Sequence, residues 1–152
     1  MIALLDTGFL RNLEAGDAMT ADAYERLRMS YQLRFLPISS HELVYGAVKD
    51  DTLSHQFLLK ADIYGIERIE LTGVQLDFAE KAAAKLQVDN LVKNAHTAHL
   101  LAEAAAGPLV KFLLTDSKTA NSVRMAKVNS IFESSGLNKI HLIKIQKVLQ
   151  SF

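Results

Sequence analysis

Three acidic residues, Asp6, Glu42 and Asp116, each follow a short run of apolar residues. Hard divalent cations such as magnesium prefer oxygen ligands, so carboxylates in this arrangement could hold one. If the apolar runs are parallel strands of one sheet, the acids converge at the edge where open α/β sheets bind their ligands. The placement of the three acids therefore predicts a divalent cation site.

The elements that would position these acids alternate between strands and helices. The apolar runs before the acids predict strands at 2–5, 35–38 and 110–114, with further strands at 66–71 and 140–145. Helices are predicted at 8–13, 21–33, 40–48, 54–64, 75–86, 89–106 and 121–133. Such alternation is typical of a three-layer α/β/α sandwich with a mainly parallel central sheet. With no linker visible, residues 1–152 are expected to form a single domain.

The composition fits a globular protein and excludes several kinds of site. Hydrophobic residues make up 49% of the 152 residues and charged residues 22%, which is ordinary for a packed domain. The chain has no cysteine, so disulfides, thiolate zinc sites and cysteine nucleophiles are excluded. No stretch approaches the roughly 20 apolar residues of a membrane span. We therefore expect a cytoplasmic protein with no membrane partner.

The net charge is zero, but the two halves of the chain differ in sign. Residues 1–76 hold 7 basic and 11 acidic side chains, and residues 77–152 hold 10 basic and 6 acidic ones. Lys118, Arg124 and Lys127 follow the last candidate acid closely. They are candidates for contact with phosphate, and the alternative is an ordinary solvated helix face.

Each candidate acid also has an interpretation that involves no ligand. Asp6 and Asp116 precede predicted helices, where aspartate is a favoured N-cap. Ser39 and Glu42 have the spacing of a capping box, in which the glutamate reaches back to the cap backbone. His96, three residues before a second histidine, would need further nitrogen or sulfur ligands to hold zinc, so we expect a surface or partly buried histidine. The occurrence of acids after three predicted strands favours the metal site over capping alone.

Three short blocks of the sequence resemble the signature blocks of PIN domains, the nuclease domains of VapC-type toxins. They are Leu-Leu-Asp-Thr at 4–7, Ser-Ser-His-Glu-Leu-Val-Tyr-Gly at 39–46 and Leu-Leu-Thr-Asp at 113–116. The resemblance implies a metal-dependent endoribonuclease in which Asp6, Glu42 and Asp116 bind Mg²⁺ or Mn²⁺ and are catalytic. It also implies that Thr7 and Thr115 orient these acids by hydrogen bonds, with Ser117 as a further polar neighbour. An RNA substrate, a small antitoxin partner and a homodimer formed through the first helices are implied by the resemblance alone.

The chain departs from the PIN pattern at two places. Within the segment 93–100, Asn94 stands where the family usually has a further aspartate, and Asp89 could replace it only if the helix began differently. Ser117 follows Asp116 where the family often has another acid. These departures leave a second hypothesis open, a catalytically weakened PIN-like domain that acts as a nucleic-acid-binding or protein-interaction module. A receiver-like phosphoacceptor is a third, but the chain lacks the early paired acids and the late lysine of such domains.

Overall fold

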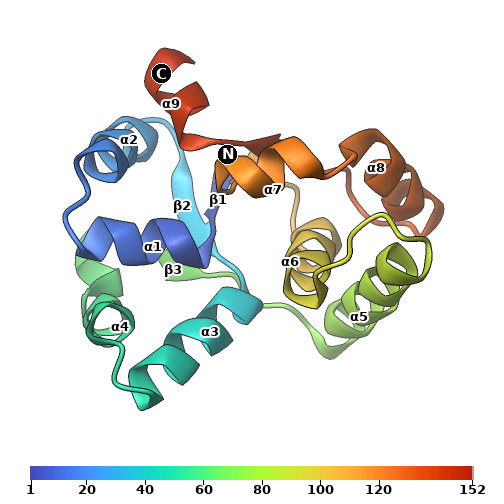
Figure 1. Ribbon diagram of the computed structural model, residues 1–152, viewed down its shortest axis with the longest axis horizontal. Helices are drawn as coiled ribbons and strands as arrows, with labels where there is room; N and C mark the ends of the chain where they lie inside the picture. Colours follow the sequence, from blue (N-terminus) through green and yellow to red (C-terminus); the bar gives the residue numbers. More distant parts are fainter. Residues whose placement is uncertain (152) are drawn as a thin grey trace.

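The computed structural model describes residues 1–151, and five short strands in this part of the chain form one sheet. They lie in the order β3-β2-β1-β4-β5, and all four neighbouring pairs are parallel. The strands are β1 (Ile2–Leu5), β2 (Gln32–Phe35), β3 (Glu67–Arg68), β4 (Phe112–Leu114) and β5 (Leu142–Ile143). Helices cover both faces (Figure 1), so the prediction of an α/β/α sandwich is confirmed.

The helices divide between two hydrophobic clusters, one on each face of the sheet. Helices α1 (Thr7–Glu14), α2 (Ala18–Arg28), α3 (Pro37–Val48), α4 (Thr52–Tyr64) and α9 (Ile145–Ser151) contribute to the first cluster. Helices α5 (Gly73–Val88), α6 (Ala95–Ala106) and α8 (Met125–Ser134) contribute to the second, while the short α7 (Ser117–Ser122) has no buried residue. Along residues 1–151, no helix is both long and apolar enough to cross a membrane.

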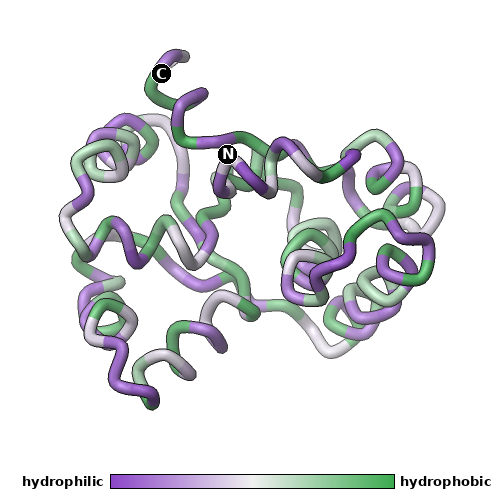
Figure 2. The backbone as a smooth tube through the Cα atoms, viewed as in Figure 1, coloured by the Kyte–Doolittle hydropathy of each residue, from purple (hydrophilic) through white to green (hydrophobic). Residues whose placement is uncertain are grey.

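Strand residues alternate between the two clusters. Ala3 and Leu5 of β1 pack into the first cluster and Leu4 into the second, as expected because successive side chains point to opposite faces of a sheet. In β4, Phe112 and Leu114 pack on one side and Leu113 on the other. Both strands are therefore buried on both faces, and Figure 2 shows hydrophobic residues along the central strands and on parts of the surrounding helices.

The sheet changes its direction of growth between its two central strands. From β1 the chain adds β2 and β3 on one side, and later adds β4 and β5 on the other. Such a switch point leaves a crevice beyond the carboxyl ends of the two strands, where ligands bind in open α/β sheets. Leu5 is paired with Leu114, so the residues that follow β1 and β4 leave the sheet side by side.

The second strand and the helix after it lie earlier than predicted. The strand predicted at 35–38 is β2, which ends at Phe35, and Pro37 already belongs to the first turn of α3. Proline suits that position because its fixed φ is helical and the N–H it lacks would have no partner there. Ser39 is consequently inside the helix, so the predicted capping box is wrong. Instead, the carboxylate of Glu103 accepts a hydrogen bond from the Ile38 N–H at 2.9 Å.

Three further predicted elements have different bounds. The helix predicted at 89–106 begins at Ala95, because Asn90 adopts a left-handed backbone (φ 61°) and Asn94 caps α6. The helix predicted at 121–133 is two helices, since Val123 is extended between α7 and α8. The strand predicted at 140–145 is reduced to β5 and is followed by α9, which was not predicted.

Candidate active site

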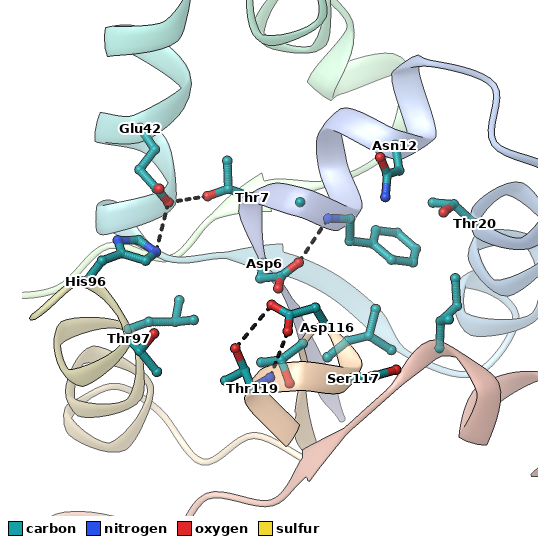
Figure 3. Close-up of a pocket in the computed structure, with 16 residues that line it drawn as sticks. Asp6, Thr7, Asn12, Thr20, Glu42, His96, Thr97, Asp116, Ser117 and Thr119 are labelled. Atoms are coloured by element: carbon teal, nitrogen blue, oxygen red, sulfur yellow. Dashed lines mark hydrogen bonds and ion pairs between the residues drawn. The ribbon is translucent and has the colours of Figure 1, made fainter. Parts of the chain in front are cut away.

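A cavity of about 380 Å³ opens beyond the carboxyl ends of β1 and β4, and all three predicted acids line it. We call it the acid pocket. Figure 3 shows Asp6 and Asp116 beside each other, with Glu42 approaching from α3. Its lining residues are Asp6, Thr7, Gly8, Phe9, Asn12, Thr20, Glu42, His96, Thr97, Leu100, Leu114, Thr115, Asp116, Ser117, Thr119 and Ile145.

Asp6 and Asp116 are N-caps as well as pocket residues. The Asp6 carboxylate accepts a hydrogen bond from the Phe9 N–H at 2.9 Å at the start of α1. Asp116 accepts hydrogen bonds from the N–H of Thr119 at 2.7 Å and from its hydroxyl at 3.1 Å at the start of α7. Capping fixes the side chains close to the backbone. The two predicted interpretations of these acids are therefore compatible, because the caps hold both carboxylates at the mouth of one cavity.

Asp6 is the carboxylate whose ionisation the pocket opposes most clearly. Burial raises its pKa from the ordinary 3.8 to about 6, and the negative charges of Asp116 and Glu42 add to the rise. Hydrogen bonds from the backbone N–H groups of Phe9 and Asp116 act in the opposite direction. A carboxylate with like charges around it lowers its free energy when a cation binds nearby.

Glu42 is held by two side chains from other elements. Its Oε1 accepts a hydrogen bond from the Thr7 hydroxyl at 2.5 Å, and Nε2 of His96 lies 3.2 Å from the same oxygen. These contacts join α3 to α1 and α6 across the pocket (Figure 3). The contact predicted for Thr7 is therefore present, and it fixes the direction in which Glu42 points.

His96 is the pocket residue whose place the sequence reasoning missed. Its side chain is 41% exposed and faces Glu42, and it lies two residues after the cap Asn94, in the first turn of α6. The available signal was the spacing: Asn94 is a favoured N-cap, and a helix that begins at Ala95 places His96 in its first turn. The predicted start at 89 concealed this arrangement.

Thr115 and Ser117 flank Asp116 but differ in their contacts. The Thr115 hydroxyl is buried at the base of the pocket and has no hydrogen-bond partner within residues 1–151. Ser117 lies on the opposite side of Asp116, and its hydroxyl is 3.3 Å from the side-chain oxygen of Gln146. The predicted hydrogen bond from Thr115 to a neighbouring acid is therefore not formed within residues 1–151.

The two alternative acid positions do not reach the acid pocket. The Asn94 side chain accepts a hydrogen bond from the Thr97 N–H at 3.1 Å, which turns it to the start of α6. Asp89 follows the last turn of α5 and pairs with Lys85 at 3.1 Å. The side chains of Asn94 and Asp89 therefore each form their contacts at the end of a helix, and neither residue lines the acid pocket.

The predicted basic residues separate in the structure. Lys118 and Arg124 line a second cavity, of about 730 Å³, that also includes Lys93. Lys127 is exposed on α8 and lines neither cavity. The two cavities share Thr97, Asp116 and Thr119 in their linings.

The side chains of the acid pocket fit an open cation site and not a closed one. Within residues 1–151, no group of three or more His, Cys, Asp or Glu side chains is arranged to hold a metal ion. Magnesium usually binds proteins through one or two carboxylates and keeps several waters. The adjacent carboxylates of Asp6 and Asp116 and the raised pKa of Asp6 match that pattern.

Comparisons with known proteins place the fold but not the activity. No protein-family model matches the sequence, and no curated protein does. A chain in the crystal structure of VapBC2 from Rickettsia felis, bound to a DNA fragment from their promoter, superposes with a TM-score of 0.66. The match covers 95% of this chain and 98% of that chain, at 17% sequence identity. The five-stranded parallel sheet and its helices therefore have the PIN-like fold of this neighbour.

Proposed function

We propose that the protein is a metal-dependent endoribonuclease of the PIN type, with Asp6, Glu42 and Asp116 as its catalytic residues. One observation carries the proposal: three carboxylates from separate elements line one cavity at the switch point of a PIN-like sheet. Acids that served only as caps would have no reason to gather in this way. An RNA phosphodiester is the substrate class.

The chain's own residues divide the work. Asp6 and Asp116 provide the carboxylate oxygens for Mg²⁺ or Mn²⁺, and their capping bonds keep them adjacent. Glu42 completes the acidic wall, in a direction set by Thr7 and His96. Thr115 and Ser117 provide hydroxyl groups on either side of Asp116. When bound, the cation supplies activation of the attacking water and neutralises charge on the phosphate oxygens.

Hydrolysis also requires a proton to move. Water attacks phosphorus, the bond from phosphorus to the leaving oxygen breaks, and the water's proton must leave while the leaving oxygen gains one. Glu42 and His96 form a contact that can accept and return a proton, with Nε2 and Oε1 3.2 Å apart. We assign proton transfer to this pair.

The biological setting follows from the same proposal. The neighbour with this fold is VapBC2, whose crystal structure includes a promoter DNA fragment. We propose that this chain is likewise a toxin-like protein, controlled by a small antitoxin and assembled as a homodimer in the cytoplasm. Co-purification with the product of an adjacent small gene tests the antitoxin, and light scattering of the purified chain tests the dimer.

The activity is tested with labelled single-stranded RNA in Mg²⁺ or Mn²⁺, compared with EDTA. We expect internal cleavage with the metal, none in EDTA and none for Asp6→Asn. Asp62→Asn is the matched control, because Asp62 is exposed on α4 and outside the pocket. An Asp6→Asn protein that cleaves as fast as the wild type would refute the assignment of the site.

Metal binding needs a measurement that does not depend on activity. Titration calorimetry with Mn²⁺ should show one binding event in the wild type and a loss of affinity in Asp6→Asn. A ligand that binds only the folded state also raises the melting temperature, so the shift caused by Mn²⁺ should vanish in the variant. Binding of Mn²⁺ and RNA without cleavage would instead favour the weakened, nucleic-acid-binding PIN-like domain, in which Asn94 and Ser117 stand where further acids were expected.

A further inference from the structure

The second cavity is a groove that adjoins the acid pocket. It lies between the α5–α6 connection, α7 and the link from α7 to α8, and Figure 1 shows these segments beside one another. We call it the cationic groove. Its lining residues are Asn90, Leu91, Val92, Lys93, Asn94, Thr97, Asp116, Lys118, Thr119, Ser122, Val123 and Arg124.

The groove concentrates positive charge that the folded chain does not neutralise. Lys93, Lys118 and Arg124 are all exposed, and none of them forms an ion pair within residues 1–151. Of the described residues, Asp116 is the only acid in the lining, and it lies where the groove meets the acid pocket. Three cations around one concavity favour a ligand with several negative charges.

The lining of the groove is polar and not aromatic, which favours contact with phosphates over stacking with bases. Among residues 1–151, no Phe, Tyr or His lines the groove, so this part of the chain provides no side chain there on which a base could stack. Lys and Arg contacts to phosphates fix the position of a strand without reading its sequence. The groove is therefore suited to a sugar–phosphate backbone and contributes affinity that is the same for different sequences.

The junction between the cavities fixes where such a backbone would run. Thr97, Asp116 and Thr119 belong to both linings, so a strand that continues from the groove into the acid pocket would enter it at Asp116. We propose that the cationic groove binds the phosphates of single-stranded RNA next to the phosphodiester held at the acid pocket. This inference rests on the proposed ribonuclease function and adds the strand path to it.

The test measures binding in EDTA, where hydrolysis is absent. The probe is a short fluorescein-labelled oligouridine, and the readout is fluorescence anisotropy across a range of salt concentrations. The groove variant carries Lys93→Ala, Lys118→Ala and Arg124→Ala. We expect at least about tenfold weaker binding at low salt, and a salt slope smaller by about 2, because each phosphate contact to a single strand contributes about 0.7.

A control variant has the same change of net charge away from the groove. It carries Lys81→Ala, Lys111→Ala and Lys147→Ala, which are exposed and line neither cavity. The control should bind within about twofold of the wild type, with an unchanged slope. Equal losses in the two variants would mean that net charge alone attracts RNA, and would overturn the groove as a site. The single variant Lys118→Glu provides the same comparison if the triple groove variant melts early.

Two further arms separate the possible failures. In the first, polyglutamate is used as a mimic of an acidic protein segment and competes with oligouridine. If it displaces oligouridine, and if the groove variant weakens the binding of polyglutamate as much as that of oligouridine, the groove is a protein site and the proposal fails. Cleavage assays in Mn²⁺ separate this inference from the ribonuclease assignment. A groove variant that binds and cleaves like the wild type contradicts the groove alone. A wild type that binds through the groove but never cleaves contradicts the ribonuclease assignment and leaves the groove in place.

Discussion

The acid pocket and the cationic groove are neighbours with opposite charge and different construction. Three acids and no lysine or arginine line the pocket, whereas three basic residues and one acid line the groove. The pocket acids are fixed by helix caps and by contacts between helices, while the groove cations are exposed and lack ion pairs. The proposed chemistry, which depends on exact distances, would thus use side chains held by hydrogen bonds, and the proposed binding of phosphates would use exposed side chains.

Asp116 belongs to both cavities, so its charge should have opposite effects on the two functions. In Asp116→Asn, RNA hydrolysis should fall at least about a hundredfold, or about 2.7 kcal/mol of transition-state stabilisation. RNA affinity in EDTA should rise about twofold or more, because the groove loses its only acid. Asparagine also caps helices, so α7 should persist. Cleavage rates and anisotropy report the two effects, and a parallel fall in both would break the contrast between the cavities.

Replacing Thr7 tests whether the proposed cleavage depends on the orientation of the Glu42 carboxylate. Thr7→Val removes the hydroxyl that donates to Glu42, and loss of an orienting partner around a metal site typically costs 10- to 100-fold in activity or affinity. We expect cleavage in Mn²⁺ to fall about tenfold. Thr97→Val is the control, because Thr97 also lines the pocket but no contact of its hydroxyl to another side chain is seen in residues 1–151. The contrast is lost if both variants fall equally.

His96 tests which position of α6 belongs to the pocket. His96→Asp places a carboxylate opposite Glu42 and should raise Mn²⁺ affinity about tenfold, or about 1.4 kcal/mol. Asn94→Asp should leave that affinity within about twofold, because the side chain at 94 caps α6. Titration calorimetry of the two variants measures the difference. A larger gain at 94 than at 96 would show that the cap, and not His96, faces the ion.

Replacing Asp6 tests how much the burial of this carboxylate beside two other acids lowers the stability of the fold when no metal is present. Its pKa of about 6 lies above the ordinary 3.8, so the folded chain binds this proton more tightly than the unfolded chain. The free energy of unfolding should therefore fall as pH rises from about 4 to about 6. In EDTA at pH 7, Asp6→Asn should be more stable by up to about 3 kcal/mol, since each pKa unit of the shift corresponds to about 1.4 kcal/mol, and the gain should vanish below pH 4. Urea unfolding across pH measures this, and equal pH profiles for the two proteins would contradict it.

Arg124 and Lys127 test the boundary of the groove and give the smallest effect. They lie one turn apart, but only Arg124 lines the cavity. In EDTA, Arg124→Ala should lower the salt slope for oligouridine by about 0.7, while Lys127→Ala should leave it unchanged. An equal loss from both would extend the groove onto α8 and weaken the contrast with the solvated surface around it.

The sequence predicted the parts of the fold whose signals are local. The apolar runs of β1 and β4 are continuous because both faces are buried, so the positions of Asp6 and Asp116 at strand ends followed directly. The surroundings predicted for Glu42 were wrong, because α3 begins at Pro37, a favoured first residue of a helix, and not after Ser39. The partner that satisfies the start of α3 is Glu103, far along the chain, and no local pattern indicates it.

The parts that sequence patterns missed depend on backbone turns and on packing between distant segments. The left-handed backbone of Asn90 prevents a helix from starting at 89. Because α6 starts at Ala95 instead, His96 and not Asn94 lines the acid pocket. The extended Val123 divides the last predicted long helix and shapes the groove. The backbone hydrogen bonds at these turns are local, from the Asn90 N–H to Gln87 and from the Val123 N–H to Thr119, but helix periodicity alone does not indicate where such a turn falls.

The capping role of Asp6 and Asp116 has an evolutionary consequence. A codon for aspartate becomes one for asparagine by a single-nucleotide change, and asparagine caps helices about as well. A lineage can therefore silence this chain without unfolding it, while the lysines and arginine next door stay intact. If the proposed ribonuclease activity harms the cell, selection for survivors should enrich such substitutions ahead of truncations or core lesions, and the folded variants should still bind RNA through the proposed groove.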